Sequence, residues 1–283
     1  FPIRHLVEGM FGYLDTVLII ACAMTFMKSI QGCGLLDSLA AWTVRRFKDH
    51  PVLLCIAVTL LIMLPGMITG SSTAGCLTTG ALVAPVLVSM GVPRAKGAAA
   101  IAMGAIYGMI APPIDIPVMI IGGGIDMPYV GFTGPLLFAT VPLAVISSLW
   151  LLLPHLKGGG SNGSELEARL KAMEEVPLRP SLFLPFAVLA GLMALEALFK
   201  GKVSLGMPLQ FLLAASSAFM VGRRMNPLSV AREAVRDAMP VLGILMGVGM
   251  FIQVMTLTGV RGFVVVSCLA VPLALLYPMM GLS

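Results

Sequence analysis

Charged residues are scarce in this sequence. Only 11% of its 283 residues are charged, whereas hydrophobic residues make up 58%. A soluble domain typically carries about 25% charged residues, so the composition excludes a soluble globular protein. The net charge of +5 does not indicate a nucleic-acid partner, because Lys and Arg in a membrane protein mainly set its orientation. We therefore predict an all-α polytopic membrane protein embedded in the lipid bilayer.

Residues that commonly carry catalysis are also scarce. The chain has three histidines and five cysteines, with no CxxC pair and no His–Cys spacing typical of a metal site. No Ser/His pair, paired aspartates or HExxH motif stands out in the apolar runs. We predict that the protein is not an enzyme and has no catalytic residues.

Glycine and proline are abundant, with 31 and 20 residues respectively. Plain spanning helices need fewer, so these numbers indicate broken or closely packed helices. An amphipathic stretch at 35–50 follows the first apolar run. The apolar runs predict helices over 9–31, 52–68, 73–90, 94–110, 118–124, 129–153, 181–200, 203–222, 238–259 and 262–281.

The stretch MITGSSTAGCLTTG, residues 67–80, interrupts an apolar run with glycine, serine and threonine. Irregular backbone in lipid is tolerated only where it is buried in protein or lines a wet cavity. We predict a hairpin over 52–90 with its tip at 70–73. Free N–H groups at the N-terminus of its second helix would attract a carboxylate, and hydroxyls and unwound carbonyls can ligate sodium. The alternative is that these small residues only let helices pack closely.

A second interruption, APPIDIP at 111–117, divides the helix over 94–124. Its three prolines cannot continue a helix without loss of backbone hydrogen bonds. A carboxylate within a membrane segment costs about 3 kcal/mol on insertion scales, so Asp115 is expected to face a cavity or a cation. The alternative is an ordinary outer loop with a solvated Asp115.

Together the two interruptions define one candidate site. The candidate substrate- and ion-binding residues are Gly70, Ser71, Ser72, Thr73, Pro112, Pro113 and Asp115. Sodium is the suspected coupling ion, with Gly70, Ser71 and Asp115 as its candidate ligands.

Suppose that the hairpin 52–90 returns to the side of the membrane from which it starts. The Lys and Arg residues then concentrate on one side of the membrane. Most of the 18 Lys and Arg residues then share one face, which the positive-inside rule places in the cytoplasm. Both ends of the hairpin are therefore expected to be cytoplasmic. The residues on this face are Arg45, Arg46, Lys48, Arg94, Lys96, Lys157, Arg169, Lys171, Arg179, Arg223, Arg224, Arg232 and Arg236.

An offset of 225 residues aligns the first helix with the helix over 238–259, and pairs Phe26 with Phe251 and Gly34 with Gly259. An odd number of crossings between similar segments gives an inverted repeat, as in many secondary transporters. We predict a first repeat over 1–154, a cytoplasmic linker with a short amphipathic helix over 155–180, and the start of a second repeat over 181–283. The second hairpin would follow Ser283, so we expect the sequence to be a fragment with an incomplete second repeat.

The sequence TGSSTAGCLTTGALVAPVLVSMGVPRAKGAAAIAMGAIYGMIAPPIDIPVMIIGGG, followed by GFTGPLLFATVPLA, resembles a known family. It is similar to the large membrane subunit of tripartite ATP-independent periplasmic (TRAP) transporters, the DctM-like family. The resemblance covers residues 8–153 well, and 181–283 resembles the early part of the family's second repeat.

This resemblance implies a permease of the inner membrane with an elevator-type transport domain. It further implies sodium-coupled uptake of an organic anion, often a C4-dicarboxylate, in partnership with a small membrane subunit and a periplasmic solute-binding protein. Two alternatives stay open, namely a stand-alone sodium- or proton-coupled carrier and a non-transporting membrane scaffold.

Overall fold

The computed structural model describes residues 3–124, 132–156, 171, 179–198, 205–221 and 223–269. Throughout this part of the chain the secondary structure is helical, without strands. The predicted all-α membrane protein is thereby confirmed, since five helical segments among the described residues are long and apolar enough to span a bilayer. These segments are Leu14–Gly32, Pro51–Thr69, Ser72–Ser89, Thr133–Leu156 and Pro227–Leu257. The chain divides into two compact units, residues 18–238 and residues 1–17 with 239–283.

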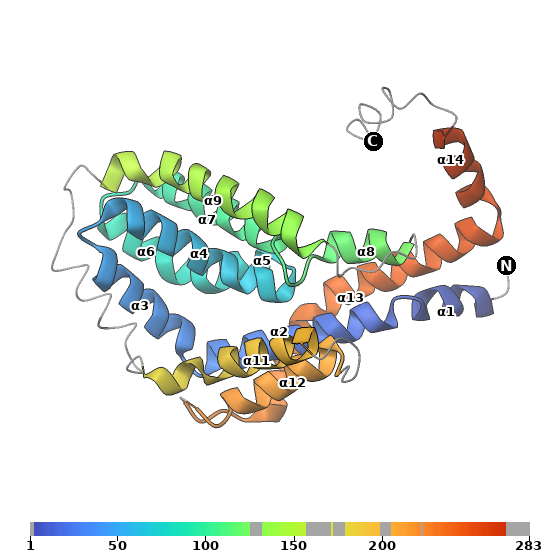
Figure 1. Ribbon diagram of the computed structural model, residues 1–283, viewed down its shortest axis with the longest axis horizontal. Coiled ribbons are helices and arrows are strands. Elements are labelled where there is room, and N and C mark those ends of the chain that lie inside the picture. The colour runs from blue at the N-terminus through green and yellow to red at the C-terminus, as the bar shows by residue number, and fades with distance from the viewer. Residues whose placement is uncertain are drawn as a thin grey trace. The chain divides into compact units, whose positions relative to one another are not determined.

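The larger unit contains a helical bundle built around the predicted hairpin (Figure 1). The first arm is α4 (Pro51–Thr69). The second arm is one continuous helical run, made of α5 (Ser72–Gly75), the π-helix η1 (Cys76–Gly80) and α6 (Ala81–Ser89). The bundle is completed by α7 (Arg94–Ile110) and α9 (Thr133–Leu156). The hairpin over 52–90 is thus present in the structure.

Glycines bring α4 and α7 into backbone contact. A Cβ added to Gly66 would lie 2.8 Å from the carbonyl carbon of Gly108, and one added to Gly108 would lie 2.4 Å from the Met63 carbonyl oxygen. A hydrogen bond between the Thr59 and Ser148 hydroxyls joins α4 to α9. Because packing rather than water exclusion drives association of helices in lipid, such small-residue contacts stabilise the bundle.

The charged ends of the bundle helices lie together. The Lys96 ammonium sits 5.4 Å from the centre of the Trp150 ring, which places the start of α7 beside the end of α9. Only the short segment 90–93 links the end of α6 to the start of α7. Leu54 near the start of α4 belongs to the same core cluster as Leu87 and Met90, so the hairpin begins and ends at one end of the bundle. That this end is cytoplasmic stays a prediction.

A second group of helices in this unit packs around Phe26 of α2 (Leu14–Gly32). The Phe26 ring is fully buried and lies 5.9 Å from the ring of Phe186 and 5.8 Å from that of Phe211. These partners belong to α11 (Leu184–Leu198) and α12 (Met207–Ala218). The group also includes η3 (Pro180–Phe183) and the first part of α13 (Pro227–Leu257). By contrast, α3 (Leu35–Phe47) packs on the hairpin, with Ala40, Ala41 and Val44 in the core of the bundle.

The smaller unit contains α1 (Ile3–Phe11), the second part of α13 and α14 (Val260–Leu269). Its helices meet at a pair of glycines. A Cβ on Gly9 would lie 2.5 Å from the Gly249 carbonyl oxygen, and one on Gly249 would lie 2.3 Å from the Gly9 carbonyl oxygen. The two backbones therefore touch directly at this point.

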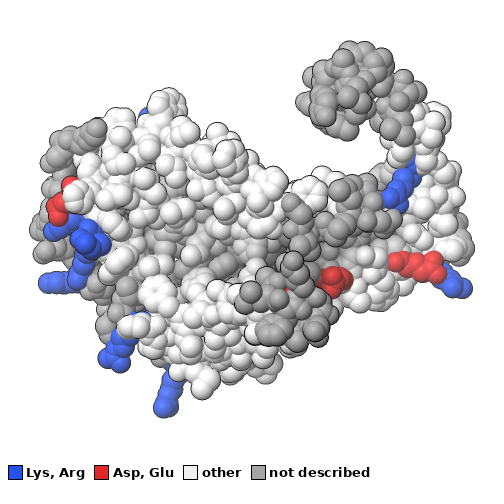
Figure 2. All heavy atoms as spheres, viewed as in Figure 1, with Lys and Arg blue, Asp and Glu red and all other residues white. Residues whose placement is uncertain are grey.

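The visible surface of the molecule is largely uncharged (Figure 2). Large apolar side chains of α9 are among the most exposed, with 84% of Phe138 and 74% of Trp150 accessible. Exposed apolar side chains on this scale are expected where a helix faces lipid.

Three helix boundaries differ from the prediction. The helix predicted over 9–31 is present as α2, Leu14–Gly32, but its predicted start is wrong. The chain breaks between α1 and α2, where the Gly12 N–H donates to the Glu8 and Gly9 carbonyls in a turn. The helix predicted over 238–259 begins earlier, at Pro227, because its polar first part buries Ala234 and Ala238 on one face. The helix predicted over 262–281 is seen as α14, and the residues after 269 lie outside the described part of the chain. The short helix predicted within the linker 155–180 also lies outside the described residues.

Local geometry repeats at the predicted offset of 225 residues. Gly34 and Gly259 both have left-handed backbones, with φ of 84° and 76°. Each donates a hydrogen bond of 3.2 Å to the carbonyl three residues before it, that of Gln31 or Thr256, and each directly precedes a new helix, α3 or α14. A left-handed glycine commonly ends a helix, so this shared turn does not test the repeat. The repeat, its inversion and the division at 155–180 stay predictions.

Candidate functional site

The hairpin tip is a two-residue interruption between helices. Gly70 caps α4 with φ of 63° and ψ of 24°, and its N–H donates to the Gly66 carbonyl over 2.7 Å. A left-handed backbone favours glycine, because a Cβ would crowd the following carbonyl. Ser71 is then extended, and its hydroxyl oxygen accepts a hydrogen bond from the Ala74 N–H at 3.4 Å. The next helical run starts at Ser72.

The second break follows the end of α7 at Ile110. The peptide bond between Pro112 and Pro113 is cis, and helical structure resumes as α8 (Ile116–Gly124). Asp115 stands immediately before α8, and its Oδ1 accepts a hydrogen bond from the Val118 N–H at 3.1 Å. The carboxylate therefore caps the N-terminus of α8. Only 1% of Asp115 is accessible, so it is not the solvated loop residue of the alternative interpretation.

The structure brings the two breaks into contact. The Ile114 N–H donates to the Met67 carbonyl near the tip, over 3.2 Å. A Cβ placed on Gly70 would lie 2.6 Å from Cγ1 of Ile116 and 3.1 Å from Cγ2 of Ile114. The absence of a side chain at Gly70 is thus what lets the residues on either side of Asp115 pack on the hairpin tip.

The predicted site residues differ in their exposure. Pro112 and Asp115 are buried, Pro113, Ser71 and Ser72 are partly buried, and Thr73 is exposed. Gly70 and the stretch containing Pro112, Pro113 and Asp115 come together, whereas the Ser71 hydroxyl turns toward its own helix. The direct contacts between the breaks include Met67, Ile114 and Ile116, which sequence reasoning did not single out. No pattern identified them, because an apolar side chain beside a proline is not distinctive.

The junction combines four helix ends, since α4 and α7 end there and α5 and α8 begin there. Helix C-termini expose carbonyl oxygens, and helix N-termini expose N–H groups with partial positive charge. Carbonyls and a carboxylate suit a hard cation, and N–H groups suit an anion. Among the described residues, no three His, Cys, Asp or Glu side chains cluster as a transition-metal site would require.

Two further ionisable side chains of the apolar runs have partners that the sequence analysis missed. Lys28 of α2 lies 2.7 Å from an Asp237 carboxylate oxygen and 4.0 Å from one of Glu233. Glu196 of α11 accepts a hydrogen bond from the Gln210 amide of α12. A signal for the first existed, because Glu233 and Asp237 are four residues apart and share a helix face.

The comparisons with known proteins decide the family. The family model "Tripartite ATP-independent periplasmic transporter, DctM component" matches residues 25–279, which is most of the chain. The chain belongs to the DctM family. The searches among curated proteins and among solved structures gave no match.

Membership in the DctM family fixes the general role of the protein. A DctM component is the membrane permease subunit of a TRAP transporter, which takes up solutes. The family is one of transporter subunits rather than enzymes. The apolar helices of this DctM chain agree with a multi-pass membrane protein, and the hairpin tip and the Pro-Pro break both lie within the matched range.

Proposed function

We propose that this DctM chain forms part of a permease that carries an organic anion, such as a C4-dicarboxylate, across the inner membrane with sodium as coupling ion. The observation that carries the proposal is the contact of the two breaks, through Gly70 and the residues that flank Asp115. Secondary transporters commonly bind solute and ion between discontinuous helices near the bilayer midplane.

In this proposal the cation is held at the ends of α4 and α7. The Gly70 carbonyl and the Ser71 hydroxyl are neutral oxygen ligands, and Asp115 supplies negative charge. A cation that leaves water for a low-dielectric site loses much of its hydration energy, and a nearby carboxylate offsets part of that loss. Burial of Asp115 supports this role, because a buried carboxylate requires compensation.

The anion would be held at the N-termini of the two resumed helices. Ser71, Ser72 and Thr73 surround the start of the run 72–89, and Pro112 and Pro113 shape the backbone before α8. N–H groups and hydroxyls there suit a carboxylate. α7 has 17 residues and is about 25 Å long, less than the hydrocarbon core of about 30 Å. If Arg94 lies at one boundary of the hydrocarbon core, the Pro-Pro break at the other end of α7 therefore lies inside the core, short of its opposite boundary.

The family also bears on partners. TRAP transporters join a DctM component to a small membrane subunit and a periplasmic solute-binding protein, and we propose the same assembly here. This assembly distinguishes the proposal from a stand-alone sodium- or proton-coupled carrier, and solute uptake itself distinguishes it from a membrane scaffold.

Uptake by the full-length protein tests the proposal. The permease would be reconstituted in proteoliposomes with its small subunit, and a labelled C4-dicarboxylate would be supplied with or without the binding protein. We expect accumulation only with an inward sodium gradient and the binding protein present. Accumulation driven by a pH gradient without the binding protein would instead identify a stand-alone proton-coupled carrier.

A further inference from the structure

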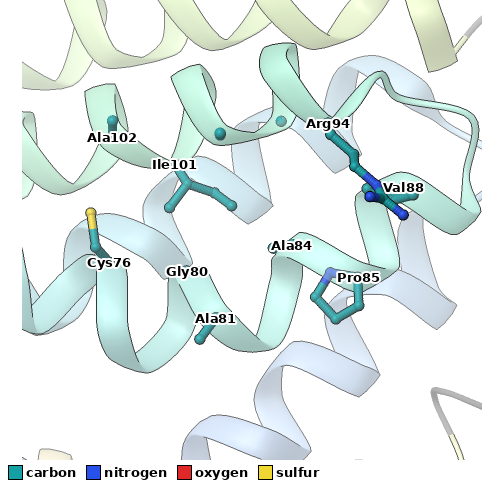
Figure 3. A pocket seen from close by; sticks show the side chains of 11 residues that line it. Cys76, Gly80, Ala81, Ala84, Pro85, Val88, Arg94, Ile101 and Ala102 are labelled. Atoms are coloured by element: carbon teal, nitrogen blue, oxygen red, sulfur yellow. The ribbon is translucent and has the colours of Figure 1, made fainter.

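An apolar groove runs between the second arm of the hairpin and α7 (Figure 3). No residue of the two breaks lines it. Its volume is about 480 Å³. The walls consist mostly of small apolar side chains, so neighbouring side chains leave the space between the helices unfilled. The residues that matter most here are Gly80, Ala84, Pro85, Gly97, Ala98 and Ile101.

The groove narrows at Gly80 and is open toward the start of α7. A Cβ on Gly80, the last residue of η1, would lie 2.5 Å from Cγ2 of Ile101, so η1 and α7 are in contact there, and the groove continues past them to Cys76 and Ala102. At the open end a Cβ on Gly97 would meet only a Val92 methyl carbon, at 3.8 Å. Arg94 lies at this open end, and its side chain reaches beside Val88 of α6 (Figure 3).

Arg94 is the charged residue of the groove. Its side chain is exposed, and the ion pairs found within the described ranges do not include it. The neighbouring Lys96 instead lies over the Trp150 ring and does not line the groove. A single guanidinium at the mouth of an apolar groove matches a ligand with one anionic group and a hydrocarbon tail.

We propose that this groove binds a glycerophospholipid, with its phosphate on the Arg94 guanidinium and one acyl chain between α6 and α7. From Arg94 to Ala102 the groove extends about 12 Å along α7, and one leaflet contributes about 15 Å of hydrocarbon. The groove therefore accommodates most of the depth of one leaflet. A small organic dianion does not fit this chemistry, because the apolar walls offer no partners for a second carboxylate.

Cross-linking of a lipid probe to the full-length protein tests this inference independently of the transported solute. Purified, delipidated protein in an uncharged maltoside detergent would be titrated with phosphatidylethanolamine that carries a diazirine in one acyl chain. Peptide mass spectrometry would locate the label. We expect saturable labelling of the segment 81–102 in preference to the lipid-facing surface of α9.

Variants separate the two parts of the site. Arg94→Gln should raise the half-saturating probe concentration about tenfold, as expected for loss of a charged hydrogen bond, whereas Lys96→Gln should leave it unchanged. Ala84→Phe should abolish saturable labelling because the ring fills the groove, and Ala98→Phe provides the same test from α7 if the first variant does not fold. A diacylglycerol probe, which lacks the phosphate, should bind weakly and equally to wild type and Arg94→Gln.

Three outcomes would overturn the inference. They are labelling as strong on α9 as in the groove, labelling unaffected by both phenylalanine variants, and no labelling of the segment 81–102.

Discussion

At the scale of single residues, Gly70 is the position on which the contact of the two breaks most depends. Its backbone is left-handed, and the space where a Cβ would stand is occupied by Ile116 and Ile114. Both the conformation and the packing therefore require glycine.

We predict that Gly70→Ala destabilises the protein and separates the two breaks. The left-handed backbone alone costs a non-glycine residue about 1–2 kcal/mol, and the clash with Ile116 adds to that cost. Thermal unfolding of the full-length protein in detergent should show a lower midpoint. Gly191→Ala in α11 is the matched control, because a Cβ there meets nothing within 4 Å. Equal midpoints for Gly70→Ala and wild type would show that the tip does not need glycine.

The site residues that sequence reasoning identified are those whose residue type is unusual in a membrane segment. Gly70, Pro112 and Asp115 stood out because a flexible residue, a helix breaker and a charge interrupt apolar runs. Ile114 and Ile116 did not, since an apolar residue gives no sign of its partner. The capping bond from Val118 to Asp115 was also not foreseen, because it depends on where α8 begins.

At the scale of elements, an ion pair joins α2 to α13 within the larger unit. Lys28 is 22% exposed, and Asp237 is 45% exposed. Glu233 lies one helical turn before Asp237 and is a weaker second partner.

A double-mutant cycle of Lys28→Met and Asp237→Asn measures this connection. We expect a coupling free energy of about 0.5–1 kcal/mol, the range for partly exposed pairs. The cycle of Lys28→Met with Glu233→Gln should give a smaller value, because that pair is 4.0 Å apart. Strict additivity in the first cycle would mean that the ion pair does not hold α2 and α13 together.

Helix existence was predicted better than helix continuity. α4 lies within a residue of its predicted ends, because its apolar run is bounded by charge on one side and the GSS tip on the other. The break at Gly12 and the π-helix at Cys76–Gly80 were not predicted. Both depend on which backbone carbonyl accepts the hydrogen bond from each backbone N–H. Apolar composition does not determine this hydrogen-bonding pattern.

At the scale of the whole molecule, the sidedness of the helices follows from the hairpin. Leu54 near the start of α4 shares a core cluster with Leu87 and Met90 at the end of the hairpin, so both hairpin ends lie at one end of the bundle. From the positive-inside rule we predict that this end is cytoplasmic.

Cysteine labelling tests the sidedness. In a background without the native cysteines, single cysteines at Lys48, Lys96 and Gly160 should react only with reagents that enter the cytoplasm. Cysteines at Asp126 and Gly201 should react from outside the cell. Opposite results for Lys48 and Lys96 would contradict the hairpin topology, because these residues flank its two arms.

The central claim is that the Asp115 carboxylate supplies the charge for the coupling ion. The structure also makes Asp115 the cap of α8, so its two roles must be separated. Asp115→Asn keeps an oxygen that can accept from the Val118 N–H but removes the charge, whereas Asp115→Ala removes both. Ser72→Ala removes a neutral oxygen ligand and should impair uptake less than Asp115→Ala does. The expected loss of binding free energy is about 1 kcal/mol.

The most direct measurement is the sodium dependence of solute uptake in proteoliposomes that contain the full-length assembly, with variant protein levels matched. The account predicts that Asp115→Asn leaves the protein folded and raises the sodium concentration for half-maximal uptake about tenfold or more, as loss of a partly desolvated charge should. The opposite result is an unchanged sodium dependence in Asp115→Asn together with an unfolded Asp115→Ala. It would show that Asp115 only caps α8 and would contradict the claim.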